Sequence, residues 1–153
     1  MIELDTINLE KIDYENKRHL EYLKELMQSK DINYLWDLSD ERLLNNQNDG
    51  KYIVINDTND YIGYLNISNP TEARYGKTVS LYYAVKEEYR GKQYGKLIIE
   101  EASDWLFNNQ GIDCIVAQVD ISNTPSIKTL TKAGMTSVSK DEEYNTFIQT
   151  KNR

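Results

Sequence analysis

Two glycines and three cations lie close together in the stretch from Leu81 to Ala102, LYYAVKEEYRGKQYGKLIIEEA. The first residues form an apolar run typical of a strand, and the last ones have the apolar spacing of an amphipathic helix. The glycines are Gly91 and Gly95, and the cations are Arg90, Lys92 and Lys96. A helix start leaves backbone N–H groups unpaired and carries partial positive charge, so it binds phosphate oxygens well. The stretch predicts a site for a phosphorylated ligand.

The spacing of the glycines separates three kinds of phosphate-binding loop. A Walker loop has four residues between its glycines and Ser or Thr after its Lys; here there are three, and Leu97 follows Lys96. Two glycines four positions apart also do not supply the dinucleotide fingerprint. Residues 90–95, RGKQYG, resemble the R-x-x-G-x-G/A loop of the GNAT acyl-CoA transferases, and the preceding AVKEEY resembles its lead-in. Gln93 departs from that pattern, which has glycine there and with it easy access to positive φ.

A second motif opens with Asn123-Thr124-Pro125-Ser126 and closes with Lys132-Ala133-Gly134-Met135. It resembles the N-x-x-S-x-x-x-L-x-K-x-G-F/M signature of the GNAT branch that includes the ribosomal-protein N-terminal acetyltransferases. One helix and one strand fit between the two motifs, as that family requires. The resemblance extends from Tyr52 to the C-terminus. On the basis of the two motifs, the chain is identified as similar to the GNAT N-acetyltransferases.

The resemblance implies how acetyl-CoA would bind. The main chain of Tyr83 and Val85 would pair with the pantetheine arm, and the Val85 N–H would polarise the thioester oxygen. Backbone amides of residues 90–95 would wrap the diphosphate. Asn123 would either bind the pantetheine arm or cap a helix. The donor-binding residues so implied are Tyr83, Val85, Arg90, Gly91, Lys92, Gln93, Tyr94, Gly95, Lys96, Asn123 and Ser126.

Two candidate catalytic residues follow, Ser126 and Asp120. Ser126 would contact the CoA sulfur and stabilise or protonate the thiolate, unless it only caps its helix. Many relatives carry a tyrosine seven positions after the asparagine as general acid, and Leu130 stands there in this chain. Some relatives carry a glutamate five positions before the asparagine as the base, and Gln118 stands there in this chain.

A primary amine near pKa 10.4 must lose its proton before attack, and at neutral pH this costs about 4 kcal/mol. Asp120, at the end of a strand, is the candidate base, with a solvated strand-end carboxylate as its alternative role. Tyr82 or Glu143 acting through water remain open, as does an acceptor of lower pKa. Cys114 lies in an apolar strand and is expected to be a buried, inert thiol rather than an acyl carrier.

The bulk properties limit the possible functions. The 153 residues predict a single GNAT-like domain over 1–153. A net charge of −7 disfavours nucleic-acid binding and suits a cationic amine acceptor. One Cys and one His predict neither a disulfide nor a metal site. The acidic start and the lack of a long apolar segment predict a cytoplasmic protein without membrane contact.

The expected elements give a mixed α/β fold with a mostly antiparallel sheet flanked by helices. The expected strands are 2–9, 52–55, 61–67, 78–85, 114–119, 136–139 and 144–149, and the expected helices are 14–29, a short one within 31–48, 95–109 and one beginning at Pro125. Residues 69–77 are expected to be a loop, and strand 114–119 is expected to be covered on both faces. By resemblance, the parallel central strands 78–85 and 114–119 splay apart around pantetheine.

Four further residues have predicted roles. His19 is expected at a solvated helix position rather than as a base. Leu35 and Trp36 would line an acceptor pocket or fill the core, and Ser39 would cap the short helix that follows.

The sequence thus predicts an N-acetyltransferase that moves an acetyl group from acetyl-CoA to a primary amine in a ternary complex. The acceptor would be a small molecule or a peptide, and a homodimer is left open. One alternative is a CoA-binding regulatory module with little turnover, which the departures at Gln93, Gln118 and Leu130 keep open. Another is a structural domain without nucleotide affinity.

Overall fold

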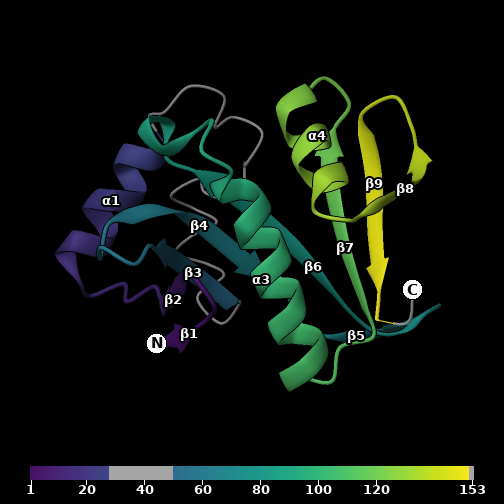
Figure 1. Cartoon of the computed structure of the whole chain (residues 1–153), viewed down its shortest axis with the longest axis horizontal. Helices are drawn as coiled ribbons and strands as arrows, with labels where there is room; N and C mark the ends of the chain where they lie inside the picture. The colour runs from purple at the N-terminus through teal and green to yellow at the C-terminus, as the bar shows by residue number, and fades with distance from the viewer. Residues whose placement is uncertain (28–49, 152–153) are drawn as a thin grey trace.

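A nine-stranded mixed sheet with helices on both faces forms the part of the chain that the computed structural model describes, residues 1–27 and 50–151 (Figure 1). The strands are β1 (Ile2–Glu3), β2 (Asn8–Lys11), β3 (Gly50–Ile55), β4 (Tyr61–Ile67), β5 (Thr71–Ala73), β6 (Gly76–Val85), β7 (Cys114–Asp120), β8 (Thr136–Lys140) and β9 (Tyr144–Thr150). The helices are α1 (Lys17–Met27), the short 3-10 turn η3 (Glu87–Tyr89), α3 (Tyr94–Asn109) and α4 (Thr124–Lys132).

The strand order is β1-β2-β3-β4-β6-β7-β9-β8, with β5 pairing to β6 beside this path. The pair β6–β7 is parallel and the other pairs are antiparallel. The predicted mixed α/β fold is therefore confirmed. No helix in the described ranges is both long and apolar enough to cross a membrane.

The parallel strands β6 and β7 stay paired only at their beginning. Their register runs from Thr78 opposite Cys114 to Ser80 opposite Val116. Both strands then continue, to Val85 and Asp120, without pairing to each other. The splay that the family resemblance implied is present.

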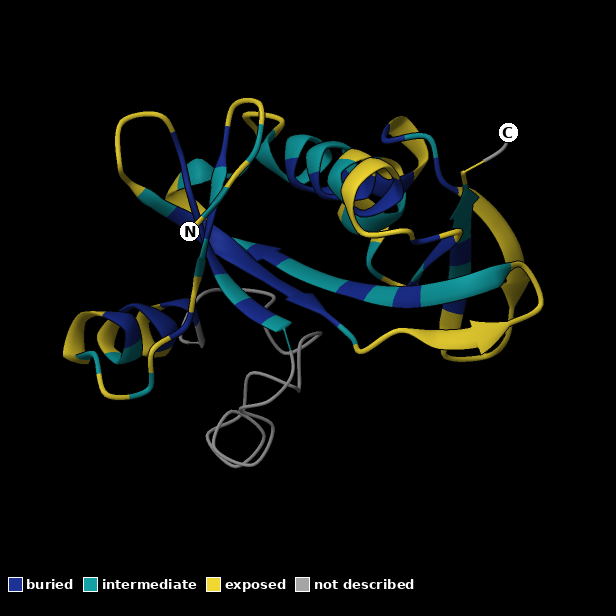
Figure 2. Cartoon of the chain, turned by 90° about the horizontal axis from the view of Figure 1, so that it is seen from below, coloured by how far each residue is buried: buried dark blue, intermediate teal, exposed yellow. Residues whose placement is uncertain are grey.

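Two apolar clusters, one on each face of the sheet, pack the sheet against its helices (Figure 2). On one face α3 and α4 pack against the centre of the sheet, with Ile98, Leu106 and Leu130 buried. On the other face α1 packs against β3, β4 and β6. The expectation that strand 114–119 is covered on both faces is wrong, because α1 packs on strands farther along the sheet and Gln118 is exposed.

The first predicted strand is instead a tight hairpin. The Leu4 N–H donates to the Ile7 carbonyl at 2.9 Å, and this turn divides residues 2–9 into β1 and the start of β2. Glu101 on α3 accepts from the backbone N–H groups of Thr6 and Ile7 at 2.7 and 3.2 Å. The turn arises because its unpaired amides find a carboxylate on α3, a partner distant in sequence.

The predicted loop 69–77 also contains a hairpin. β5 pairs with the first residues of β6 around a two-residue turn, and Gly76 has φ of 105°. Asp113 accepts from the Lys77 N–H at 2.9 Å. A long-range contact therefore extends β6 toward its N-terminus.

Helix α1 begins three residues later than predicted because Asn16 caps it, accepting from the Arg18 N–H at 2.9 Å. The solvated position expected for His19 is wrong. Its side chain is buried, Nδ1 accepts from the Asp13 N–H at 2.9 Å, and Nε2 lies 3.2 Å from Glu10 Oε1. The short helix within 31–48, with Leu35, Trp36 and Ser39, lies outside the described residues.

Candidate active site

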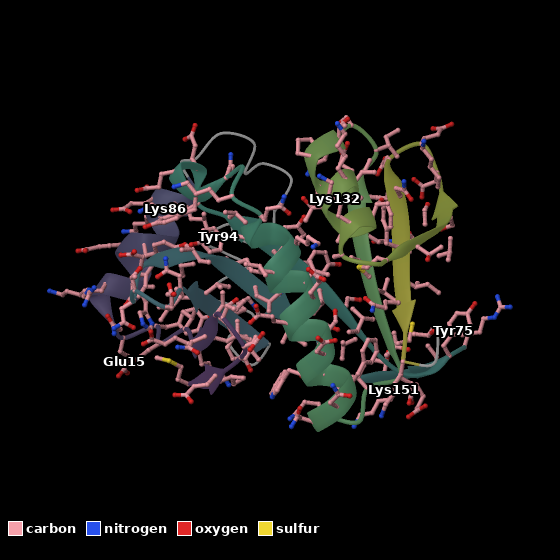
Figure 3. The ribbon with its side chains drawn as sticks, viewed as in Figure 1. Glu15, Tyr75, Lys86, Tyr94, Lys132 and Lys151 are labelled. Atoms are coloured by element: carbon pink, nitrogen blue, oxygen red, sulfur yellow. The ribbon has the colours of Figure 1, made fainter. Side chains whose placement is uncertain are left out.

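The splay between β6 and β7 opens into a cleft of about 800 Å³. The start of α3 and the whole length of α4 form its other walls, and Figure 3 labels one lining residue from each helix, Tyr94 and Lys132. The predicted site residues that line the cleft are Tyr83, Val85, Arg90, Gly91, Gln93, Tyr94, Gly95, Lys96, Asp120, Asn123 and Ser126. Lys92 does not line it; its Nζ lies 5.7 Å from the centre of the Tyr89 ring.

The peptide groups of β6 alternate between β4 and the cleft. The Ser68 N–H donates to the Ser80 carbonyl at 3.0 Å, and the N–H of Lys86, just past the strand, donates back to β4 at 2.8 Å. Even-numbered residues therefore bond to β4, and in an antiparallel ladder the next residue faces the other way. The main chain of Tyr83 and Val85 is thus directed into the splay, as predicted.

The loop before α3 has two residues in the left-handed region. Gly91 has φ of 78° and Gln93, which directly precedes the helix, has φ of 70°. Gln93 thus has the positive φ that glycine adopts easily, although the side chain there disfavours it. A Cβ on Gly95 would lie 3.1 Å from Thr129 Cγ2 and 3.3 Å from Tyr83 Cε2. Glycine at this position lets the start of α3 approach α4 and β6.

Four cationic side chains line the cleft, in a chain whose net charge is −7. Arg90 Nε donates to the Val85 carbonyl at 2.9 Å, and Lys96 Nζ lies 3.4 Å from Glu100. Lys128 and Lys132 were not predicted as site residues. Their spacing of four positions puts them on one face of a helix, so the sequence could have indicated them once α4 was assigned.

Replacing Gln93 with glycine should remove about 1 kcal/mol of backbone strain, partly offset by greater freedom of the unfolded chain. We expect slightly higher thermal stability and acetyl-CoA affinity raised about threefold, since the side chain no longer limits backbone approach to the phosphates. Differential scanning fluorimetry and calorimetry measure the two effects.

The matched control for that change is Asn59→Gly. Asn59 also has positive φ, 63°, but lies in the β3–β4 turn and does not line the cleft. It should leave acetyl-CoA affinity unchanged. Equal affinities for the wild type and Gln93→Gly would contradict the assignment of this loop to the phosphates.

At the cleft, the beginning of α4 contacts β6 through a side-chain hydrogen bond. Asn123 caps the helix, its side-chain oxygen accepting from the Ser126 N–H at 3.3 Å. The Ser126 hydroxyl instead lies 2.9 Å from the Tyr83 hydroxyl, across the cleft wall. Burial raises the pKa of the Tyr83 phenol, outweighing the hydrogen bonds with Ser126 and Thr129, which lower it. The tyrosine–serine pair was not predicted, because only the folded chain brings the two residues together.

Asp120 lies at the exposed end of β7 and lines the cleft. It accepts hydrogen bonds from the Ser122 hydroxyl and the Ser122 N–H, at 2.5 and 2.8 Å. These bonds, the hydroxyl first, lower the pKa of the Asp120 carboxyl below its ordinary value. A carboxylate stabilised in this way is a weak base but keeps its negative charge.

Some of the other candidates for proton transfer line the cleft and others lie outside it. Tyr82 and Gln118 line the cleft, whereas Glu143 does not. Cys114 is buried, as predicted, and burial raises the pKa of its thiol. Tyr144, which pairs with Asp120 in the β7–β9 ladder, also lines the cleft and was not predicted.

A protein-family profile, described as the acetyltransferase (GNAT) family, matches residues 13–135. The chain belongs to this family. The match covers the splayed strands, the loop 90–95 and all of α4. A search of curated proteins gave no match.

Solved structures support the same fold. An acetyltransferase of the GNAT family from Bacillus anthracis matches with a TM-score of 0.81 at 15% identity, over 99% of each chain. The Campylobacter jejuni N-acetyltransferase PseH in complex with acetyl coenzyme A matches with a TM-score of 0.72 at 18% identity, over 95% of this chain and 99% of that one. The aminoglycoside acetyltransferase AAC(6')-Ib in complex with coenzyme A and kanamycin matches with a TM-score of 0.75 at 17% identity, over 95% of each chain.

Proposed function

We propose that this GNAT protein transfers the acetyl group of acetyl-CoA to a primary amine by direct transfer in a ternary complex. The observation that carries the proposal is the splay of β6 from β7, with peptide groups of β6 directed into the cleft between them. The Val85 carbonyl already accepts from Arg90, but the N–H groups in that position need a partner, and an extended amide-bearing arm supplies one. Acetyl-CoA-binding neighbours with this fold support the donor.

The donor end of the cleft is suited to an anion. Backbone amides of residues 90–95 would hold the diphosphate, helped by the positive end of α3. Lys128 and Lys132 on α4 add cations along the same wall. With the diphosphate held there, the Val85 N–H would polarise the thioester oxygen and Ser126 would lie by the sulfur.

The acceptor end has the opposite charge. Asp120 keeps its negative charge because Ser122 lowers its pKa, so it would attract and orient an ammonium group. The same lowered pKa makes Asp120 a poor base. We therefore infer that the reactive acceptor is the fraction of amine that loses its proton to water.

The acceptor is a small amine or the α-amine of a peptide. Neighbours with this fold include aminoglycoside and spermidine acetyltransferases, which favours a small polycationic amine. The Asn123-to-Met135 motif, similar to that of the ribosomal-protein N-terminal acetyltransferases, favours a peptide terminus. A CoA-binding module without turnover is the second candidate, because Leu130 and Gln118 replace the family's usual acid and base.

Steady-state release of CoA thiol with a panel of amines tests the proposal. The panel holds spermidine, kanamycin and a dipeptide with a free α-amine. We expect turnover of at least one of them, with kcat/KM rising about tenfold per pH unit up to the pKa of that acceptor. The pH at which the rise ends should differ between acceptors of different pKa, and it should be unchanged in Asp120→Asn.

The donor is tested separately by thermal unfolding. Acetyl-CoA at 100 times its dissociation constant should stabilise the protein by about 2.7 kcal/mol. Stabilisation by acetyl-CoA without turnover of any amine would favour the binding module. The absence of both would refute the proposed function.

A further inference from the structure

We propose that Tyr83 is the proton donor to the CoA thiolate, in place of the tyrosine that many relatives carry at the position of Leu130. The inference rests on the proposed function, because it requires the thioester to lie by Ser126. Tyr83 comes from β6 and not from α4, so the acid would reach the sulfur from the strand side of the cleft.

Position and surroundings distinguish Tyr83 from two other tyrosines of the cleft, Tyr89 and Tyr94. Its hydroxyl lies 2.9 Å from Ser126 Oγ, the group expected beside the sulfur. Its main chain faces the splay two residues before Val85, whose N–H would hold the thioester oxygen. By contrast, Tyr89 and Tyr94 pack edge to face, with ring centres 5.9 Å apart, at the phosphate end.

Leu130 cannot replace Tyr83 chemically. Its side chain is apolar and only 1% exposed, so it fills space beneath the C-terminal half of α4. The Tyr83 phenol is protonated at neutral pH, because burial raises its pKa above the ordinary value of 10.0. A neutral phenol is the form that donates a hydrogen bond to a developing thiolate.

In the proposed step, the carbonyl carbon exchanges its bond to sulfur for a bond to nitrogen. The amine nitrogen forms its bond to the carbonyl carbon and releases one proton to water. The carbon–sulfur bond breaks, the sulfur keeps the electron pair, and Tyr83 gives its hydroxyl proton to the sulfur. The phenolate recovers a proton from water by way of the half-exposed Ser126 hydroxyl. The products are the acetylated amine and CoA with a free thiol.

Tyr83→Phe removes one oxygen and keeps the ring that packs against Gly95. We expect kcat to fall about 100-fold while the dissociation constant of acetyl-CoA changes less than about threefold. Ser126→Ala should cost less, about tenfold, because the phenol remains. A larger loss in Ser126→Ala than in Tyr83→Phe would overturn the proposal, since the serine would then be the acid.

A binding measurement tests the contact without any acceptor. A hydrogen bond from Tyr83 should lower the pKa of the bound CoA thiol by about one unit from a free value of about 8.5. CoA should then bind about sixfold tighter at pH about 9 than at pH about 7, relative to desulfo-CoA, which lacks the sulfur. Tyr83→Phe should abolish this difference.

Tyr22→Phe is the matched control. Tyr22 is also buried, at 4% exposure, and its hydroxyl has no hydrogen-bond partner among the described residues. It should keep wild-type turnover and the wild-type pH effect. If CoA binds and the effect is equal in the wild type and Tyr83→Phe, only the role of Tyr83 is overturned. If CoA does not bind to the wild type, the proposed function fails and the inference fails with it.

Discussion

We expect Gly95→Glu to weaken acetyl-CoA binding by at least about 100-fold, or about 2.7 kcal/mol. A side chain at this position starts between Thr129 and Tyr83, in the wall of the cleft. The glutamate would place a carboxylate in the cleft where the diphosphate is proposed to lie, and like charges a few ångströms apart repel by about 1–4 kcal/mol near a protein surface. Isothermal titration calorimetry measures the loss.

Gly95→Ala separates the steric part of that effect from the charge repulsion. Its Cβ would meet a methyl group at 3.1 Å and a ring carbon at 3.3 Å, so the neighbours need to move only a few tenths of an ångström. We expect affinity within about fivefold of the wild type. Thermal unfolding without ligand shows whether either variant remains folded. A folded Gly95→Glu that binds acetyl-CoA normally would place the donor site elsewhere.

The elements whose patterns are local were predictable from the sequence. Strand alternation, the helix with Ile98 and Leu106 on its inner face, and the Pro125 helix start all depend on neighbouring residues. The errors arise where a distant residue decides the outcome. Glu101 turns the first strand into a hairpin, and Asp113 helps to order the hairpin in the predicted loop.

The same distinction holds for the candidate site: some of its residues could be predicted from the sequence, and others only from the fold. The loop 90–95 and the cap Asn123 carry motifs with fixed spacing, so the sequence identifies them. The bond between Tyr83 and Ser126 joins residues 43 positions apart and belongs to no motif. The bonds from Ser122 that weaken Asp120 as a base depend on the geometry of one turn. Spacing therefore locates the proposed donor site, whereas candidates for proton transfer can be chosen only from the folded chain.

Gly63→Ala should destabilise the fold by about 3 kcal/mol and lower Tm by about 6–12 °C. Gly63 lies opposite Val85 in the β4–β6 ladder. A Cβ at Gly63 would fall closer than 3.0 Å to the Ala84 carbonyl oxygen, a separation that real Cβ atoms essentially never show. That oxygen is backbone and cannot move alone, so β6 would have to shift. Thermal or urea unfolding monitored by circular dichroism measures the loss.

The consequence extends to the active site, because the residue opposite Gly63 is the one whose N–H is proposed to hold the thioester oxygen. Gly63→Ala should therefore lower kcat even below its unfolding temperature, through displacement of Val85. Gly91→Ala is the control for stability: its φ is 78° but no atom lies within 4 Å of a Cβ there, so it should cost only about 1 kcal/mol. A smaller loss in Gly63→Ala than in Gly91→Ala would contradict the register of β4 against β6. Because that register sets which peptide groups of β6 face the cleft, the proposed donor site would then be wrong as well.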